Sequence, residues 1–430
     1  MPLSAGRIEI TVMSLVLLLA AGKAVPQDMV PSGLARHHEE EEPGTHLAEP
    51  EALGPTRCQG GKAGPFPCSH IDVLSFMPLS SIGGDGSAHG NDLWGWTDPQ
   101  TGKEYALMGL TTGTAFVDIT NPEAPLYLGL LPTQTLASPW RDLKVYKNYA
   151  FIVAEAQGHG MQVFDLKRLR HVGAPPVIFS AVAHYRDNGL SNTHNIAINE
   201  ETGYAYLTGT NTCGGGLHMV DIRKPRQPKF AGCFSGDGYT HDAQCVSYRG
   251  PDGAYGGREI CFAANEDTLT VVDVSDKNAP RMLSRTTYQG VGYTHQCWTT
   301  EDQHYLLLDD ELDERTFGHG TRTYIWDIVD LDAPRHIGTH QSKKRAIDHN
   351  QYVRDGFTYQ ANYQGGLRIL DLSAVSDGRL KEVAFFDVFP TGNRPGFNGA
   401  WSVYPFFPSG VVIVSGIEQG LFILQANLPR

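Results

Sequence analysis

Short apolar runs that end in an aspartate and lead into a turn, often with proline, recur along most of the chain. Such runs are typical of β-strands that end in tight turns. Seven copies occur, at residues 113–125, 160–166, 215–228, 268–280, 321–334, 365–373 and 420–429. The aspartates are Asp118, Asp165, Asp221, Asp273, Asp327 and Asp371, and the last copy has Gln425 instead. The aspartates follow one another at intervals of 44 to 56 residues, which suits four short strands and their turns.

Two further strands recur in each copy. A polar segment opens into a first strand, as at residues 194–199, and a second β-rich run follows, as at residues 204–209. The seventh copy lacks its fourth strand, and residues 71–79 look like that missing outer strand. The sequence therefore predicts an all-β, seven-bladed β-propeller of four-stranded antiparallel blades, closed by an N-terminal strand. The alternative is an open β-solenoid, against which the leftover N-terminal strand argues.

Composition and charge exclude some partners and help to assign the N-terminal segments. The 48 glycines and 26 prolines supply many turns, and the formal charge of −13 disfavours a nucleic-acid partner and a polybasic membrane contact. Arg7 precedes an apolar run at residues 10–22, so we expect residues 1–24 to be a signal peptide or an uncleaved signal anchor. We expect residues 25–55 to be a disordered acidic linker and residues 56–430 to form the propeller. The protein is then extracellular, either secreted or on the cell surface, with N-terminal membrane anchoring if the leader is uncleaved.

Seven cysteines in an exported chain indicate disulfides with one thiol left over. Cys58 and Cys68 bracket a loop rich in glycine and proline. Cys213 with Cys233 would tie one strand pair, and Cys245 with Cys261 fall on consecutive strands. Cys297 is then the odd cysteine, and other pairings stay open.

Several motifs resemble a known family. The Asp-terminated runs are similar to LVIVD repeats, and the cysteine pair 58–68 together with residues 91–96, 193–199, 232–242 and 257–267 resembles the choice-of-anchor B proteins. The resemblance covers the chain from about residue 58 to its end. It implies a secreted β-propeller and no particular activity. Members commonly carry a C-terminal anchor, which we do not expect here, because the sequence stops just after the last strand.

We expect the metal- and ligand-binding residues at the start of each first strand, because first strands line the central channel of a propeller. The opening column of the seven copies reads Asn91, Arg141, His194, His241, His295, His349 and Gly399, and the next column includes Asp92, Asp142 and Asp242. The turn after the second strand adds Glu155, Glu266 and Glu311 to the same rim. We predict a divalent-metal site at the channel mouth, with the ligands His194, His241, His295 and His349. We predict ligand-binding roles for Asn91, Asp92, Arg141, Asp142, Asp242, Glu155, Glu266 and Glu311.

Zn²⁺ or Mn²⁺ suits such imidazoles and carboxylates, as do Fe²⁺ and Ni²⁺, and the carboxylates alone suit Ca²⁺. The competing interpretation is that each histidine bonds the backbone of a neighbouring blade. The Asp column is interpreted as structural, since an aspartate before a turn accepts backbone N–H groups. The acidic run at residues 309–314 is interpreted as a solvated loop rather than a calcium loop.

Two functions fit these features. The first is a binding or scaffold propeller that holds an extracellular protein or glycan, and the lack of a catalytic motif favours it. The second is a metal-dependent lyase or hydrolase of extracellular polysaccharide, in which Arg141 steadies an anionic group. The tryptophans form either a carbohydrate platform or blade cores.

Overall fold

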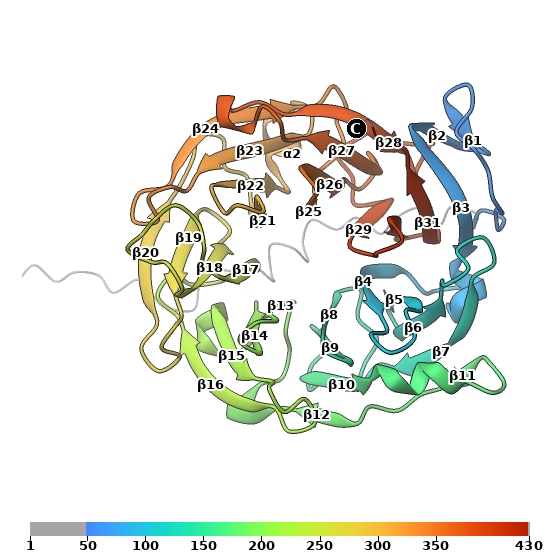
Figure 1. Ribbon diagram of the computed structural model, residues 1–430, viewed down its shortest axis with the longest axis horizontal. Coiled ribbons are helices and arrows are strands. Elements are labelled where there is room, and N and C mark those ends of the chain that lie inside the picture. Colours follow the sequence, from blue (N-terminus) through green and yellow to red (C-terminus); the bar gives the residue numbers. More distant parts are fainter. Residues whose placement is uncertain (1–48, 429–430) are drawn as a thin grey trace, which may run out of the picture.

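Residues 49–428 of the computed structural model are described, and they form a ring of seven antiparallel sheets around a central channel (Figure 1). The predictions for residues 1–24 and for residues 25–48 concern residues outside the described part. Among residues 49–428, no helix combines the length and the apolar character that a membrane crossing needs.

Each blade runs from the channel outward in chain order. Blade 1 consists of β4 (Gly90–Thr97), β5 (Glu104–Leu110), β6 (Gly113–Asp118) and β7 (Leu126–Pro132). Blade 2 consists of β8 (Arg141–Tyr146), β9 (Tyr149–Ala154), β10 (Met161–Asp165) and β12 (Ala183–Tyr185). Blade 3 consists of β13 (Asn195–Asn199), β14 (Tyr204–Thr208), β15 (Leu217–Asp221) and β16 (Lys229–Phe234). Blade 4 consists of β17 (Asp242–Ser247), β18 (Glu259–Ala264), β19 (Leu269–Asp273) and β20 (Arg281–Thr286).

The remaining blades follow the same order. Blade 5 consists of β21 (Thr294–Thr299), β22 (Tyr305–Asp310), β23 (Arg322–Asp327) and β24 (Arg335–Gln341), with the short helix α2 (Asp313–Phe317) between β22 and β23. Blade 6 consists of β25 (Asn350–Arg354), β26 (Phe357–Ala361), β27 (Leu367–Asp371) and β28 (Lys381–Phe386). Blade 7 consists of β29 (Ala400–Tyr404), β30 (Val411–Gly416), β31 (Gly420–Ala426) and β3 (Ile71–Pro78).

The N-terminal strand closes the ring, as predicted. β3 pairs with β31 along its whole length, from Ile71 opposite Ala426 to Pro78 opposite Gly420. The expected linker boundary at residue 55 is too late, however. Leu53 and Phe76 exchange two backbone hydrogen bonds of 3.3 and 2.8 Å, so the chain already pairs with β3 before residue 56.

Two additions to the blades were not predicted. After η2 (Leu166–His171) the chain returns to blade 1, where β11 (Val177–Ile178) pairs in parallel with β7. The hairpin of β1 (Lys62–Ala63) and β2 (Phe66–Ser69) extends blade 6 beyond β28. Both additions cover the outer edge of a blade, where unpaired backbone groups would otherwise be exposed.

The second strands form the core between blades. Every residue of β5, β18 and β30 is buried, because a neighbouring blade covers each face and both faces must then be apolar. The six aspartates of the repeated column cap the turns, as predicted. Each accepts the backbone N–H two residues further on, at 2.7 to 3.2 Å, in Asp118, Asp165, Asp221, Asp273, Asp327 and Asp371.

The cysteines pair as predicted. Cys58 bonds Cys68, Cys213 bonds Cys233, and Cys245 bonds Cys261 across β17 and β18. Cys297 is a free, buried cysteine on β21. Three disulfides are compatible with an extracellular protein.

Candidate metal centre

The four predicted histidines lie together at one mouth of the channel. Each precedes or begins the first strand of its blade, in blades 3 to 6, so the repeat brings them to equivalent heights around the axis. The ring centroids follow one another at 4.2 Å from His194 to His241, 4.1 Å from His241 to His295 and 4.4 Å from His295 to His349. Imidazoles bound to one ion at about 2.1 Å have centroids roughly 3.2 Å from it and therefore about 4.5 to 5.2 Å from each other. The four rings are slightly closer than that, so they form a continuous row at the mouth, and their ligand role stays a prediction.

The protein engages the Nδ1 atom of every one of these rings. Nδ1 of His241 lies 2.9 Å from the backbone oxygen of His295, and Nδ1 of His349 lies 2.5 Å from that of Trp401. A carbonyl oxygen only accepts, so both rings carry hydrogen on Nδ1, and Nε2 has the lone pair that a metal requires.

The other two rings face carboxylates through Nδ1. His194 pairs with Glu155, and His295 lies 3.2 Å from Asp309 Oδ1. A carboxylate or carbonyl behind the ring is the usual arrangement for a metal-binding histidine, since it fixes the tautomer and the orientation. The competing interpretation is confirmed for the Nδ1 atoms of His241 and His349, which bond the next blade. That contact leaves the chemistry of Nε2 unchanged.

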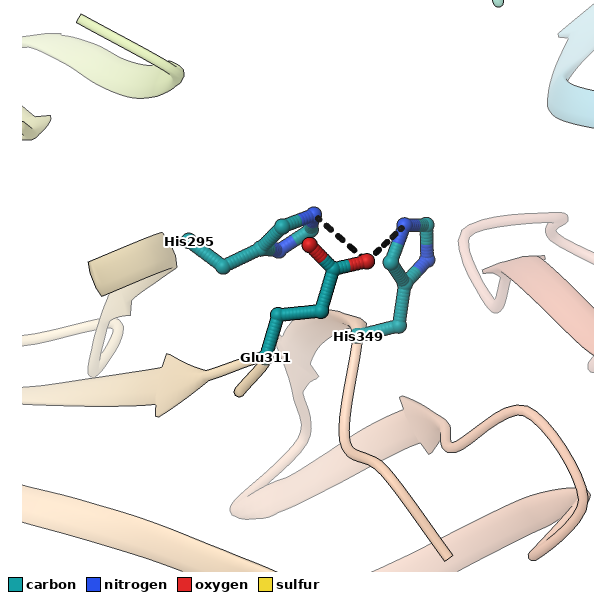
Figure 2. Close-up of side chains that lie close together, drawn as sticks. All are labelled: His295, Glu311 and His349. Carbon is teal, nitrogen blue, oxygen red and sulfur yellow. Dashed lines mark ion pairs between the residues drawn. The ribbon is translucent and has the colours of Figure 1, made fainter. Parts of the chain in front are cut away.

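Glu311 lies between two of the histidines, with one oxygen facing both rings (Figure 2). Its Oε1 is 3.9 Å from Nε2 of His295 and 3.8 Å from Nε2 of His349. The same oxygen accepts the hydroxyl of Tyr363 at 2.7 Å. Ligand atoms of His295, Glu311 and His349 all lie within 4.8 Å of one another, so these three side chains have the compactness that one metal ion needs.

The three predicted glutamates surround this mouth. Burial raises the pKa of Tyr293 well above its usual value, and the charges of Tyr239, Glu266, Glu311 and Glu155 raise it further, in that order. The ring of Tyr293 lies 5.4 Å from that of His241. Glu155 pairs with His194, and Glu311 lies between His295 and His349. The backbone oxygen of Glu266 accepts the N–H of Thr294, next to His295, at 2.6 Å. The three glutamates are therefore at this mouth.

Arg141 and Asn91 do not join this group. The guanidinium of Arg141 donates to the backbone of Leu110 and to Thr133, at 3.0 and 2.8 Å, and contacts His159 at 3.1 Å. Asn91 donates to the backbone of Pro139 at 3.0 Å. Both side chains fasten blade 1 to blade 2. The predicted role of Arg141 in steadying an anion has no support in these contacts.

Asp92 and Asp142 bind a lysine inside the channel instead. Lys144 Nζ lies 2.6 Å from Asp142 and 3.3 Å from Asp92, above the ring of Trp94. Burial opposes the charge of Lys144, but the two carboxylates outweigh it and raise its pKa well above the usual range. The neighbouring Asp242 has its pKa raised to about 8, by burial first and then by Asp142. Lys144, Asp142 and Asp92 thus compensate one another, and Asp142 also accepts the N–H of Ile196, at 2.7 Å.

An aromatic cavity of about 470 Å³ occupies the other part of the channel. Its wall includes Lys144 and ends of first strands remote from the histidines, such as Asn199 and Ser247, together with Trp94, Trp298, Tyr352, Tyr404 and Phe406. Trp96, Trp140 and Trp326 are buried. Of the six tryptophans, two line this cavity, three lie in cores, and the ring of Trp401 lies 5.0 Å from that of His349. The carbohydrate platform stays a prediction.

Sequence reasoning missed several residues of the mouth. Tyr363, Asp309 and Tyr293 contact or border the histidines, yet none belongs to an aligned histidine column. One signal was present: Gly-Tyr-Thr-His occurs at residues 238–241 and again at residues 292–295. The repeated tyrosine two positions before the histidine marks the same place in two consecutive blades.

The acidic run at residues 309–314 is not a solvated loop, and that interpretation is wrong. Asp309, Asp310, Glu311, Asp313 and Glu314 are each at most 2% exposed. Asp309 and Asp310 end the buried strand β22, and Asp313 and Glu314 begin α2. Asp309 and Glu311 also bond Gln351 and Tyr363 of blade 6. Buried carboxylates need partners or protons, so this segment carries more chemistry than a surface loop.

Comparison with known proteins confirms the repeat. The LVIVD repeat family matches residues 260–287, which span β18 to β20. The more specific likeness to choice-of-anchor B proteins stays a prediction. None of the curated proteins compared with the chain matches it.

Solved structures with a similar fold include a protein from Lactobacillus plantarum, which is 16% identical with a TM-score of 0.50, over 76% of this chain and 87% of that one. The computationally designed Ika8 protein is 11% identical with a TM-score of 0.49, over 83% and 93% of the chains. The β-propeller domain of Cps50 (Swd1) from Myceliophteria thermophila is 12% identical with a TM-score of 0.47, over 75% and 93%. At these identities the likeness concerns the fold alone.

Proposed function

We propose that this seven-bladed β-propeller, which carries an LVIVD repeat, is a secreted or cell-surface binding module with a divalent transition metal at the histidine mouth of its channel. One observation carries the proposal. Four imidazoles from consecutive blades lie with centroids 4.1 to 4.4 Å apart, and each has Nδ1 against an acceptor of the protein. Within residues 49–428, His295, Glu311 and His349 are the ligands at this mouth whose atoms all lie within 4.8 Å of one another, and we propose that His241 and His194 contribute their Nε2 lone pairs to the same ion.

The donor set narrows the choice of metal. Imidazole nitrogen suits Zn²⁺, Fe²⁺, Ni²⁺ and, with carboxylate, Mn²⁺, whereas Ca²⁺ takes oxygen ligands. Four imidazoles therefore favour a transition metal over Ca²⁺.

The ion would keep open positions for an external ligand. The histidines come from blades 3 to 6, whereas the corresponding positions of blades 7, 1 and 2 are Gly399, Asn91 and Arg141. Glycine has no side chain, and the other two side chains bond Pro139, Leu110 and Thr133 instead. A carboxylate or hydroxyl of an extracellular protein or glycan is the chemistry that such a metal would recognise.

A metal-dependent lyase or hydrolase of extracellular polysaccharide is the second candidate. It is favoured by the open coordination and by proton-transfer groups beside it. Burial raises the pKa of Tyr293, which makes it a weak acid, so the neighbouring glutamates are the proton-transfer groups of such a site. A metal that polarises a substrate carboxylate or a water would complete such a site.

Metal analysis tests the proposal. The protein is purified without added metal and its bound metal is measured by mass spectrometry, alongside a double variant with His241→Asn and His349→Asn. Asparagine keeps a donor near the position of Nδ1 and removes Nε2, so the variant should fold and lose the ion. The exposed His171 supplies the control variant His171→Asn. A folded double variant with as much metal as the control, or a natural protein that binds no transition metal, contradicts the proposal.

A second assay distinguishes the binding module from the enzyme. Metal-loaded and metal-free protein are incubated with anionic polysaccharides, and product release is compared with binding. Binding without cleavage supports the module, and cleavage that needs the metal supports the enzyme.

A further inference from the structure

A second group of possible metal ligands lies on the α2 segment, outside the histidine mouth. Asp313 and Glu314 begin α2, and His319 follows its end. The two carboxylate residues are 0% and 1% exposed, and the His319 side chain is 10% exposed. Ligand atoms of the three residues lie within 4.8 Å of one another.

The carboxylates lack the donors that burial demands. The neighbouring Asp310 shows what full compensation looks like, because its oxygens accept from two backbone N–H groups at 2.6 and 2.8 Å and from the hydroxyl of Tyr288 at 2.7 Å. Asp313 Oδ2 accepts the hydroxyl of Tyr324, at 2.7 Å, and Glu314 Oε1 accepts the N–H of Arg322, at 3.2 Å. The two carboxyl groups also lie within hydrogen-bonding reach of each other.

The remaining oxygens face no donor. Within residues 49–428, Asp313 Oδ1, Glu314 Oε2 and both oxygens of Asp348 have no hydrogen-bond partner, and no lysine or arginine forms an ion pair with them. Asp348 is 1% exposed. A buried charge without a partner costs several kcal/mol, on the order of the stability of a domain.

His319 presents a lone pair to the same place. Its Nδ1 lies 3.0 Å from the backbone oxygen of Gly320, which only accepts, so the ring carries hydrogen on Nδ1. Nε2 is then an acceptor, and it lies 3.6 Å from Asp313 Oδ2 without a hydrogen bond within the described chain. Two acceptors that face each other repel unless a cation or a proton lies between them.

We propose that Asp313, Glu314 and His319 bind a second divalent cation, Zn²⁺ or Mn²⁺, at a site separate from the histidine mouth. Ligands about 2.1 Å from one ion at a tetrahedral angle are roughly 3.4 Å apart, close to the 3.6 Å between Nε2 and Oδ2. Two carboxylates and one imidazole suit these cations, whereas Ca²⁺ avoids imidazole.

A surface cavity gives access to this site, and a bound ion would also stabilise the position of α2. His319, Phe317 and Tyr324 line a surface cavity of about 740 Å³, through which an ion reaches the buried carboxylates. Glu314 on α2 accepts the N–H of Arg322 on β23, so an ion bound to Glu314 would also hold α2 against β23. Because Glu311 directly precedes α2, the same ion would fix Glu311 beside His295 and His349.

Zn²⁺ and Mn²⁺ binding to the full chain tests this site. Chelator-stripped protein is titrated with each cation, and affinity, stoichiometry and thermal stability are measured for the natural chain, Glu314→Gln and His319→Ala. Glu123→Gln, at an exposed position, is the control. We expect both site variants to lose one equivalent or to bind it at least about 10-fold more weakly. The cation should raise the melting temperature of the natural chain and the control more than that of Glu314→Gln.

His349→Asn separates this site from the proposed function. Loss of one ion in Glu314→Gln but not in His349→Asn supports the second site even where the histidine mouth binds nothing. If stoichiometry, affinity and the thermal shift are the same in Glu314→Gln, His319→Ala and the control, the proposal is wrong, and shared protons compensate the carboxylates. Glu314→Gln also guards against misfolding, since glutamine keeps the shape of the side chain and removes a buried ionisable group.

Discussion

His241 donates its Nδ1–H to the backbone oxygen of His295, the corresponding histidine of the next blade, at 2.9 Å. The two rings lie 4.1 Å apart. One side chain thus has two separable roles, because Nδ1 joins the blades and Nε2 is the atom that can bind a metal. Substitutions that keep one nitrogen and not the other distinguish these roles.

We expect His241→Ala to lower the free energy of unfolding of metal-free protein by about 1 to 3 kcal/mol, because the buried oxygen of His295 loses a donor. His241→Asn should cost less than half as much, since its amide N–H takes over that bond. Both variants should lose metal. Chemical denaturation of the stripped proteins measures the difference, and equal stabilities for Ala and Asn would show that the bond between blades contributes little.

A second prediction concerns Glu155, whose contact with His194 should strengthen the binding of the metal. Its carboxylate pairs with Nδ1 of His194, which orients the ring and makes Nε2 more basic. Glu155→Gln should therefore weaken metal binding by about 10- to 100-fold while the fold persists. Competition with a chromophoric chelator gives the affinity. Glu201→Gln is the control, because Glu201 pairs with Arg249 at the exposed surface; an unchanged affinity in Glu155→Gln would remove Glu155 from the site.

The fold was largely predictable because each blade repeats the same pattern. Aligning the copies placed His194, His241, His295 and His349 together, since symmetry turns a sequence column into a ring of neighbours. What the alignment lacked was the direction of individual side chains. Arg141 occupies the histidine column, yet its guanidinium turns outward to Leu110 and Thr133. The buried α2 segment was missed because a run of acidic residues resembles a solvated loop, and only the tertiary contacts of blades 5 and 6 show otherwise.

The N-terminal pairing gives a third prediction. Leu53 and Thr56 together exchange four backbone hydrogen bonds with Phe76 and Val73. A chain that starts at residue 57 should melt at a lower temperature than one that starts at residue 49, by the equivalent of roughly 2 to 4 kcal/mol. A chain that starts at residue 80 lacks β3 and exposes β31, so it should aggregate. Thermal unfolding and size-exclusion chromatography measure both effects; a monomeric, folded chain without β3 would refute the closure argument.

Cys297 gives a fourth prediction, on thiol chemistry. The side chain is buried on β21, and burial raises the pKa of its thiol well above the usual value. Iodoacetamide should therefore label Cys297 only after unfolding, while the other six cysteines stay protected until reduction. Mass spectrometry of non-reduced peptides should recover the pairs 58–68, 213–233 and 245–261. Rapid labelling of Cys297 in the native protein would contradict its burial.

The pair of Asp98 and Arg170 predicts how stability depends on pH. Arg170, on η2 of blade 2, contacts both oxygens of Asp98 after β4, at 2.6 and 2.8 Å. Burial alone would raise the pKa of Asp98, but the hydrogen bonds from Arg170, Gln100 and Thr101 outweigh it and lower the pKa to about 2. An unfolded aspartate has a pKa of about 3.9, so the unfolded chain binds the proton more readily.

This pair therefore contributes about 2 kcal/mol to the free energy of unfolding. The contribution is fully present above about pH 4 and is lost as the pH falls toward 2. Asp98→Asn removes the charge and keeps the shape. Urea unfolding at pH 7 should show the natural chain more stable than Asp98→Asn by about that amount, and at pH 2.5 most of the difference should disappear. Comparing two proteins at each pH cancels the effects of the other carboxylates. A difference that is the same at both pH values would mean that the charge of Asp98 does not stabilise the contact between blades 1 and 2.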